Sequence, residues 1–375
     1  MSHIGAPCVP RIADAHRASA PKRHPGTSSE NAVYGTRARA QRTKPRAALV
    51  HARSALGHVT ARVRTERDLR AARAGRADVA IFHAHAPPPS GGGNQFLRAL
   101  EGELRRRGLT VEENRISGGT HACLFNSFNF DLARLRRFVR DDVRLVHRVD
   151  GPIGTYRGYD DGTDARIAAM NAELAQATVC QSRFSLDAHR RLGIALADPV
   201  VVTNAPDPAI FHPPESREPL GERPVRVVAA SWSDNPRKGV DVLQTLGATV
   251  DPSRFELTFV GRTKGALEGW QLVAPLASEG LAELLRGMDC YVAASIDDPC
   301  SNALLEALAC GLPALFRRSG GHPELVGEGG VGFDGPDDAC AALDRLAAEL
   351  DERRDTIVVP DLGEVADAYL EVLRA

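Results

Sequence analysis

The sequence predicts an α/β protein built from two successive doubly wound, Rossmann-like domains that face each other across a cleft. From about residue 77 onward, short apolar runs alternate with amphipathic helical patterns, and a proline-rich stretch at 206–224 interrupts this alternation once. Continuous apolar strands are typical of a parallel sheet that is covered by helices on both faces. At 375 residues the chain also exceeds the length that one core usually supports, so two domains are expected.

The first domain, residues 77–222, is expected to hold six strands and four helices, because apolar runs of strand length alternate with patterns of helical period. The strands are expected near residues 79–82, 110–112, 122–125, 144–147, 178–180 and 200–202. The helices are expected near residues 94–107, 132–140, 165–176 and 183–192.

The second domain, residues 223–362, repeats this alternation without any visible repeat of the sequence itself. Strands are expected near residues 225–230, 256–260, 290–293 and 314–316. Helices are expected near residues 240–248, 281–287, 302–309 and 338–350. A last helix within 363–375 is expected to pack back on the first domain. Open sheets of this kind bind ligands beyond the carboxyl ends of their strands.

Residues 1–76 have a different composition and are predicted to be a disordered, Arg- and Ala-rich tail. Residues 1–78 hold 16 Lys and Arg against five Asp and Glu, whereas the whole chain has a net charge of −1. Such a sequence buries too little apolar area to offset its ordering entropy. A peripheral contact with a membrane surface or polyanion is the alternative to a merely solvated tail. The tail lacks interleaved aromatic residues, so nucleic acid is not an expected partner.

The cysteines and the apolar content favour a cytoplasmic location. Seven cysteines occur without any C-x-x-C pair, which is typical of reduced thiols in a reducing compartment. The sequence has no run of eighteen apolar residues and no apolar segment of the kind found in secretory signals.

The most informative segment is SIDDPCSNALLEALACGLPAL, residues 295–315. Asp298 closes an apolar strand, Ser301 is a suitable helix N-cap, and Asn302 begins a helix. The free amide groups of that first turn favour the negative charge of a phosphate. Glu306 is nearly alone in an apolar helix, and buried carboxylates are rare unless a cation or ligand pairs with them. A structural salt bridge is the alternative to ligand binding.

Arg237 and Lys238 follow the first strand of the second domain and precede its first helix. This position places both cations at the mouth of the expected cleft. Fixed cations there would stabilise the negative charge that develops on a departing diphosphate. The alternative is an ordinary exposed pair of basic residues.

The first domain contributes a glycine-rich loop and a histidine. Gly92 and Gly93 lie between the first strand and the first helix, where glycine permits close backbone approach and the helix start favours an anion. Simple loop flexibility is the alternative. His147 is expected at the end of its strand, facing the cleft, with Asp150 orienting it or contacting the acceptor. A structural histidine is the alternative there.

The spacing Asp298-x7-Glu306, followed by Ala-Leu-Ala-Cys-Gly-Leu-Pro, resembles the E-x7-E signature of glycosyltransferase family 4, whose members are retaining enzymes of the GT-B fold. The resemblance implies that Asp298 and His147 hold the donor sugar and that Glu306 holds the ribose. It also implies that Lys238 binds the diphosphate. The sequence departs from the family in two places: Asp298 stands for Glu, and Trp232 stands where many members have Arg.

The resemblance therefore implies a metal-independent hexosyltransferase that uses a nucleoside-diphosphate sugar as donor and needs no cofactor. The acceptor, a glycan, a lipid or a small molecule, is not identified by the sequence, and no residues are expected to bind a metal. Three alternatives stay open at this point. They are a nucleotide-sugar epimerase, an enzyme like glycogen phosphorylase, and a non-catalytic GT-B module that binds polyanions through its basic tail.

Overall fold

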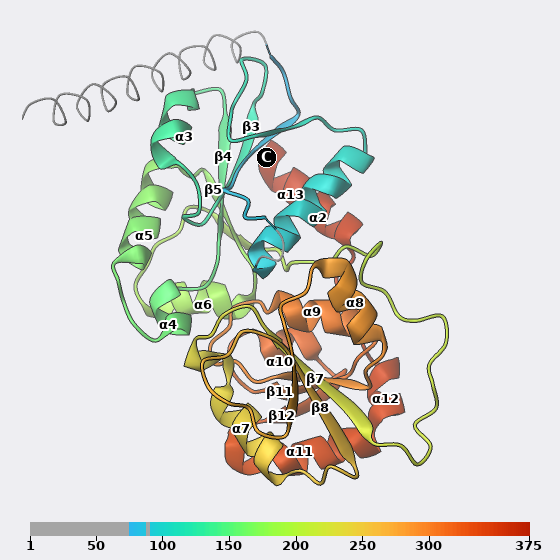
Figure 1. Cartoon of the computed structure of the whole chain (residues 1–375). Coiled ribbons are helices and arrows are strands. Elements are labelled where there is room, and N and C mark those ends of the chain that lie inside the picture. Colours follow the sequence, from blue (N-terminus) through green and yellow to red (C-terminus); the bar gives the residue numbers. More distant parts are fainter. Residues whose placement is uncertain (1–74, 88–90) are drawn as a thin grey trace, which may run out of the picture. The chain divides into compact units, whose positions relative to one another are not determined.

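The computed structural model describes residues 75–87 and 91–375, so the predicted tail lies outside the described residues except for Gly75 and Arg76. All described residues belong to one compact unit of the chain. Two six-stranded sheets follow each other along it, and all pairs of neighbouring strands are parallel (Figure 1). The predicted pair of doubly wound α/β sheets is confirmed.

The first sheet has the strand order β2-β1-β3-β4-β5-β6. Its strands are β1 (Val79–Phe82), β2 (Val111–Glu113), β3 (Ala122–Asn126), β4 (Arg144–Val149), β5 (Ala177–Cys180) and β6 (Pro199–Val201). Every residue of β1, β3 and β5 is buried. This burial on both faces explains why these strands are continuous apolar runs in the sequence.

Helices cover both faces of the first sheet. They are α2 (Gly92–Arg106), α3 (Leu132–Phe138), α4 (Ile153–Arg157), α5 (Thr163–Leu174) and α6 (Arg183–Arg191). The short helix α4 was not expected. Ile81 and its face of the sheet pack against α2, whereas the neighbouring Phe82 packs on the opposite face with Leu135 of α3. Successive side chains of a strand point to opposite faces, so each face has its own core.

The last helix, α13 (Leu362–Arg374), packs on the first sheet beside α2, although it follows the second sheet in sequence (Figure 1). Ala366 and Tyr369 are fully buried in the core that contains Leu97 and Leu100 of α2. The end of the chain therefore completes the core of the first sheet.

The second sheet has the strand order β12-β11-β10-β7-β8-β9. Its strands are β7 (Val225–Ser231), β8 (Phe255–Gly261), β9 (Trp270–Val273), β10 (Cys290–Ala293), β11 (Ala314–Arg317) and β12 (Gly330–Phe333). Strands β9 and β12 were not expected from the sequence. Strand β9 lies at an edge with two exposed residues, and β12 contains two glycines, which are depleted in strands.

The second sheet is also covered on both faces. Its helices are α7 (Val240–Thr249), α8 (Ser278–Arg286), α9 (Asn302–Ala309), α10 (His322–Val326), α11 (Pro336–Ala348) and α12 (Leu350–Asp355), with a 3-10 turn, η1 (Pro236–Lys238). Helices α7 and α11 pack on one face, and α8, α9 and α10 pack on the other. No helix among residues 75–87 and 91–375 is long and apolar enough to cross a membrane.

The order of strands in the second sheet reverses between β7 and β10, which are hydrogen-bonded neighbours. Chains leaving two such strands depart in opposite directions and open a crevice beyond their carboxyl ends. Strand β7 leads to Arg237 and Lys238 in η1, and β10 leads to Asp297, Asp298 and helix α9. The topology therefore brings together the basic and acidic segments singled out in the sequence.

Candidate functional site

The turn η1 holds the two cations in a defined position. The side chain of Asn235 accepts a hydrogen bond of 2.9 Å from the backbone N–H of Arg237, which caps the turn. Gly239, directly after Lys238, has a φ of 88°, and an added Cβ would overlap Ala294 at the end of β10. Only glycine tolerates both the positive φ and the lack of space for a Cβ atom at this position. The cations are thereby held close to the segment that follows β10.

Residues 295–299, which we call the acidic loop, pair with both cations. Lys238 Nζ lies 2.7 Å from Asp298 Oδ2, and a nitrogen of the Arg237 guanidinium lies 2.5 Å from Asp297 Oδ2. The backbone N–H of Ile296 also donates to the carbonyl oxygen of Arg237 over 2.8 Å. The described chain thus neutralises each cation with a carboxylate. A diphosphate entering the site would compete with these aspartates for the same charges.

Asp298 is buried but ionised. Asp298 is only 8% exposed. Burial by itself raises the pKa of the carboxyl, but the ammonium of Lys238 outweighs this effect with help from His322, so the pKa falls below its ordinary value. An opposite charge at such short range favours the carboxylate form. Asp298 is therefore a hydrogen-bond acceptor at neutral pH and not a proton donor.

The loop between β11 and α10 supports the acidic loop from the other side. Gly321 donates its backbone N–H to the carbonyl oxygen of Asp298 over 2.9 Å. Gly320 has a φ of 66°, and an added Cβ would overlap that same carbonyl oxygen. His322 is fully buried and hydrogen-bonds the Ser295 hydroxyl at 3.1 Å through Nε2. These contacts fix the backbone on which the Asp298 carboxylate sits.

Helix α9 begins as predicted and carries Glu306 into a buried position. The hydroxyl of Ser301 accepts a hydrogen bond of 3.4 Å from the backbone N–H of Leu304 and caps the helix. Glu306 is 7% exposed, and within the described part of the chain its carboxylate has no hydrogen-bond or ion-pair partner. Burial alone raises its pKa to about 8. Among residues 75–87 and 91–375, no salt bridge neutralises this group.

Glu306 lines a cavity of about 200 Å³. The walls come from α2 of the first sheet, from the segment that connects the two sheets, and from α8 and α9 of the second. Charged and polar groups on these walls are supplied by Gln95, Arg98, Asp207, Glu279 and Asn302. A buried carboxylate at the wall of a cavity with a few polar groups is placed to receive hydrogen bonds from a ligand.

Residues 91–93, the described end of the glycine loop, lie close to segments of the second domain. An added Cβ on Gly92 would lie 2.6 Å from the Cβ of Asn302 at the start of α9. The same atom on Gly91 would lie 3.3 Å from Trp232, whereas Gly93 has no atom within 4 Å. Gly92 therefore packs closely against a side chain of α9 and Gly93 does not, while the binding of an anion at either glycine stays a prediction.

His147 does not reach the cleft that the sequence led us to expect. It lies inside β4 and not at its end, and it is fully buried. Its Nε2 is 2.9 Å from the carbonyl oxygen of Ser127, its Nδ1 is 3.1 Å from the side-chain amide of Asn171, and its ring stacks on Phe125. Burial lowers the pKa of this histidine to about 4. Its expected position is corrected: β4 is two residues longer than the apolar pattern indicated.

Asp150, in contrast, lies close to the acidic loop. An added Cβ on the adjacent Gly151 would lie 2.8 Å from Pro299. The side chain of Asp150 is 26% exposed, and it accepts hydrogen bonds from Arg148 and Gln181. The backbone next to Asp150 therefore lies beside the acidic loop, while the contact of Asp150 with an acceptor stays a prediction.

Two polar side chains at this site were not expected. The guanidinium of Arg262, which directly follows β8, lies 4.2 Å from the ring centre of Trp232. The Glu324 carboxylate accepts hydrogen bonds of 3.0 Å from the backbone N–H groups of Arg183 and Phe184 at the start of α6. The position of Arg262 at a strand end was a usable signal. Nothing in the sequence signalled the partners of Glu324, which lie about 140 residues away.

Comparison with known proteins agrees with this architecture. Residues 223–350, about a third of the chain, match the family model described as Glycosyl transferases group 1. No curated protein sequence matches the chain.

Several solved structures share its fold. Sucrose-phosphate synthase from Thermosynechococcus elongatus superposes with a TM-score of 0.58 at 16% identity, covering 80% of this chain and 95% of the other. The chain has the GT-B fold. The catalytic domain of starch synthase IV from Arabidopsis thaliana gives a TM-score of 0.60 at 10% identity, covering 80% and 99%. HepE from Anabaena gives 0.54 at 16% identity, covering 79% and 95%. At these identities the likeness concerns the GT-B fold alone.

The two glycines at the start of α2 provide a matched pair of variants. Gly92→Ala should lower the melting temperature, because its Cβ would overlap the Asn302 Cβ. Gly93→Ala faces open space and should stabilise the protein by up to about 1 kcal/mol, since alanine loses less entropy in a helix. Thermal unfolding of both variants checks this. Equal effects in the two variants would show that the loop does not approach α9.

The pKa of Glu306 predicts a pH dependence of stability. Because the folded pKa of about 8 lies above the ordinary value of 4.5, the contribution of this group is fully present below pH 4.5. It declines as pH rises and is lost above about pH 8. Glu306→Gln should therefore gain stability relative to wild type between pH 5 and 8, measured as the difference in melting temperature across a pH series. A difference that does not change with pH would contradict this environment for Glu306.

Proposed function

We propose that this protein is a glycosyltransferase that takes a sugar from a nucleoside-diphosphate sugar and transfers it with retention of the anomeric configuration. The observation that carries the proposal is the Glu306 carboxylate, which is buried at a cavity wall without a protein partner in the described chain. A ribose offers two neighbouring hydroxyl donors, which suit a carboxylate in this position. The family match over residues 223–350 supports the same assignment.

In this proposal the diphosphate lies between η1 and the start of α9. Lys238 and Arg237 already sit within ion-pair distance of Asp298 and Asp297, and Ser301 begins the helix whose first amide groups favour an anion. A diphosphate would draw both cations from the aspartates and leave the Asp298 carboxylate free to accept hydrogen bonds from sugar hydroxyls. The cations neutralise the diphosphate, so the proposed step requires no metal ion at the donor.

Arg262 supplies a third cation near this position. Trp232 stands where many members of the resembling family carry an arginine, and the Arg262 guanidinium lies over its ring. The backbone N–H of Arg262 also donates to the carbonyl oxygen of Ser231 at the end of β7 over 3.0 Å. We assign to Arg262, which directly follows the neighbouring strand β8, the positive charge that an arginine at position 232 would provide.

The proposed reaction takes place on one face of the sugar. The bond between the anomeric carbon and the diphosphate oxygen breaks, and the acceptor hydroxyl oxygen bonds to the same carbon from the same side. The hydroxyl proton passes to the departing phosphate. Lys238 and Arg237 stabilise the charge on the leaving group. His147 is not part of this mechanism because both of its ring nitrogens are engaged in the core.

Other functions of proteins with the GT-B fold can be distinguished by the substrates they require, the products they form or the ligands they bind. A nucleotide-sugar epimerase would alter the donor sugar without an acceptor, and a phosphorylase would require inorganic phosphate and no nucleotide. A polyanion-binding module would lose ligand binding when residues 1–76 are removed. The unpartnered Glu306 side chain favours an enzyme that binds a nucleotide over a phosphorylase, because it provides an acceptor for ribose hydroxyls, and the products then separate a transferase from an epimerase.

The donor can be identified by a thermal-shift screen. UDP-glucose and ADP are the first ligands to include, because HepE was solved with UDP-glucose and starch synthase IV with ADP. GDP and its sugars complete the set. At least one nucleotide should raise the melting temperature of wild type and raise that of Glu306→Gln less. Absence of any shift across the whole set would contradict the proposal.

With the donor known, Lys238→Ala should lower turnover by roughly a hundredfold or more, the effect of losing one preorganised charge in the transition state. Lys264→Ala is the matched control, since Lys264 is 75% exposed and, among the residues that the structure describes, pairs only with Asp234. Release of nucleoside diphosphate measures turnover, and circular dichroism checks the fold. Wild-type turnover in the Lys238 variant would refute its assigned role.

A further inference from the structure

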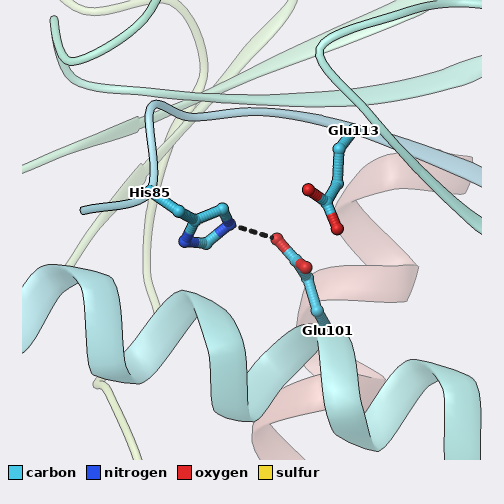
Figure 2. Close-up of side chains that lie close together, drawn as sticks. All are labelled: His85, Glu101 and Glu113. Atoms are coloured by element: carbon cyan, nitrogen blue, oxygen red, sulfur yellow. Dashed lines mark hydrogen bonds and ion pairs between the residues drawn. The ribbon is translucent and has the colours of Figure 1, made fainter. Parts of the chain in front are cut away.

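Three side chains with metal-binding atoms lie close together beside the first sheet (Figure 2). They are His85 in the segment after β1, Glu101 on α2, and Glu113 at the end of β2. One ligand atom from each lies within 4.8 Å of the other two. In Figure 2 the His85 ring and both carboxylates point toward a common centre.

We propose that His85, Glu101 and Glu113 bind a divalent transition-metal ion, with one imidazole nitrogen and a carboxylate oxygen from each glutamate as ligands. This mixture of ligands suits Zn²⁺ or Mn²⁺ rather than Ca²⁺, which prefers a shell of oxygens. Small rotamer changes bring atoms at this spacing to bonding distance from a shared ion. Water would complete the coordination.

Two of the three groups are largely buried, whereas the Glu113 side chain is 51% exposed. The side chain of Glu101 is 4% exposed and that of His85 is 14% exposed. His85 Nε2 lies 2.8 Å from a Glu101 oxygen, whereas His85 Nδ1 is buried and has no partner within the described residues. A buried polar atom without a partner is costly. In Figure 2 the ring nitrogen that faces the carboxylates is the one bonded to Glu101, so Nε2 is the ligand atom, and Nδ1 lies on the other side of the ring.

Arg105 is the group that a metal ion would displace. Its guanidinium lies 3.4 Å from Glu101 and 3.1 Å from Glu113, so it bridges the two carboxylates. The Arg105 side chain is 46% exposed and has room to move into solvent. The Arg105–Glu113 pair is exposed on both sides, and exposed ion pairs contribute little to stability, whereas Glu101 is buried. An ion bonded directly to both carboxylates would replace this bridge.

A metal ion here would also secure the segment that leads to the glycine loop. His83 and Ala86, on either side of His85, are hydrogen-bonded to Asn94 of α2 at 3.1 and 2.9 Å. A bond from His85 to an ion held by α2 and β2 would add a further attachment. Metal binding should therefore raise the melting temperature of the protein.

The test uses the full-length chain, freed of metal by a chelator, with Zn²⁺ or Mn²⁺ as the probe. Calorimetry should show one site, and the melting temperature should rise. Glu113→Gln should weaken binding by roughly tenfold or more, since it removes one ligand. Arg105→Gln should strengthen binding because it removes the competing cation. Glu103→Gln, on the same helix and bonded to Arg106 and Arg107, should bind as wild type does.

Two outcomes would overturn the proposal. The first is wild-type affinity in the Glu113 variant, which would place the ion elsewhere. The second is no binding to either wild type or Arg105→Gln at millimolar metal, which would leave the three residues as an ion-pair network. Both readouts are independent of glycosyl transfer, so they are distinguishable from failure of the proposed function.

Discussion

The carboxylate of Glu306 is the constraint on which the site depends. A buried carboxylate without a counter-charge is held in its protonated form, and its pKa of about 8 expresses that cost. The rest of α9 fits the apolar core of the second sheet, with Leu304 and Leu305 buried beside it. A buried glutamate at this position is unfavourable in the free protein, and hydrogen bonds from a bound ligand would offset that cost.

The two cations of η1 differ from Glu306 because each has a partner of opposite charge. Lys238 and Arg237 are paired with the aspartates of the acidic loop, so each cation has a carboxylate partner within the described chain. This pairing arises from topology, because η1 and the acidic loop follow the two strands that flank the reversal of the sheet. Gly239 and Gly320 permit the close backbone contacts that hold both segments in place. The strand order of the second sheet thus brings the two cations and the two aspartates together.

The strands buried on both faces, such as β1 and β10, were predictable because burial leaves a continuous apolar run in the sequence. Edge strand β9 and glycine-containing β12 were not, because pairing in the sheet overrides their weak local preference. The buried position of Glu306 was predictable from its apolar helix. The burial of His147 was not, because it depends on two polar partners, the Ser127 carbonyl and Asn171, that are distant in sequence.

The most direct test measures the protons released when a nucleoside diphosphate binds. At pH 7 free Glu306 is largely protonated, and hydrogen bonds from ribose hydroxyls should favour its ionised form. Calorimetric titration in buffers of different ionisation enthalpy should therefore detect release of close to one proton per nucleotide in wild type and almost none in Glu306→Gln. Equal proton release and equal affinity in the two proteins would contradict the account.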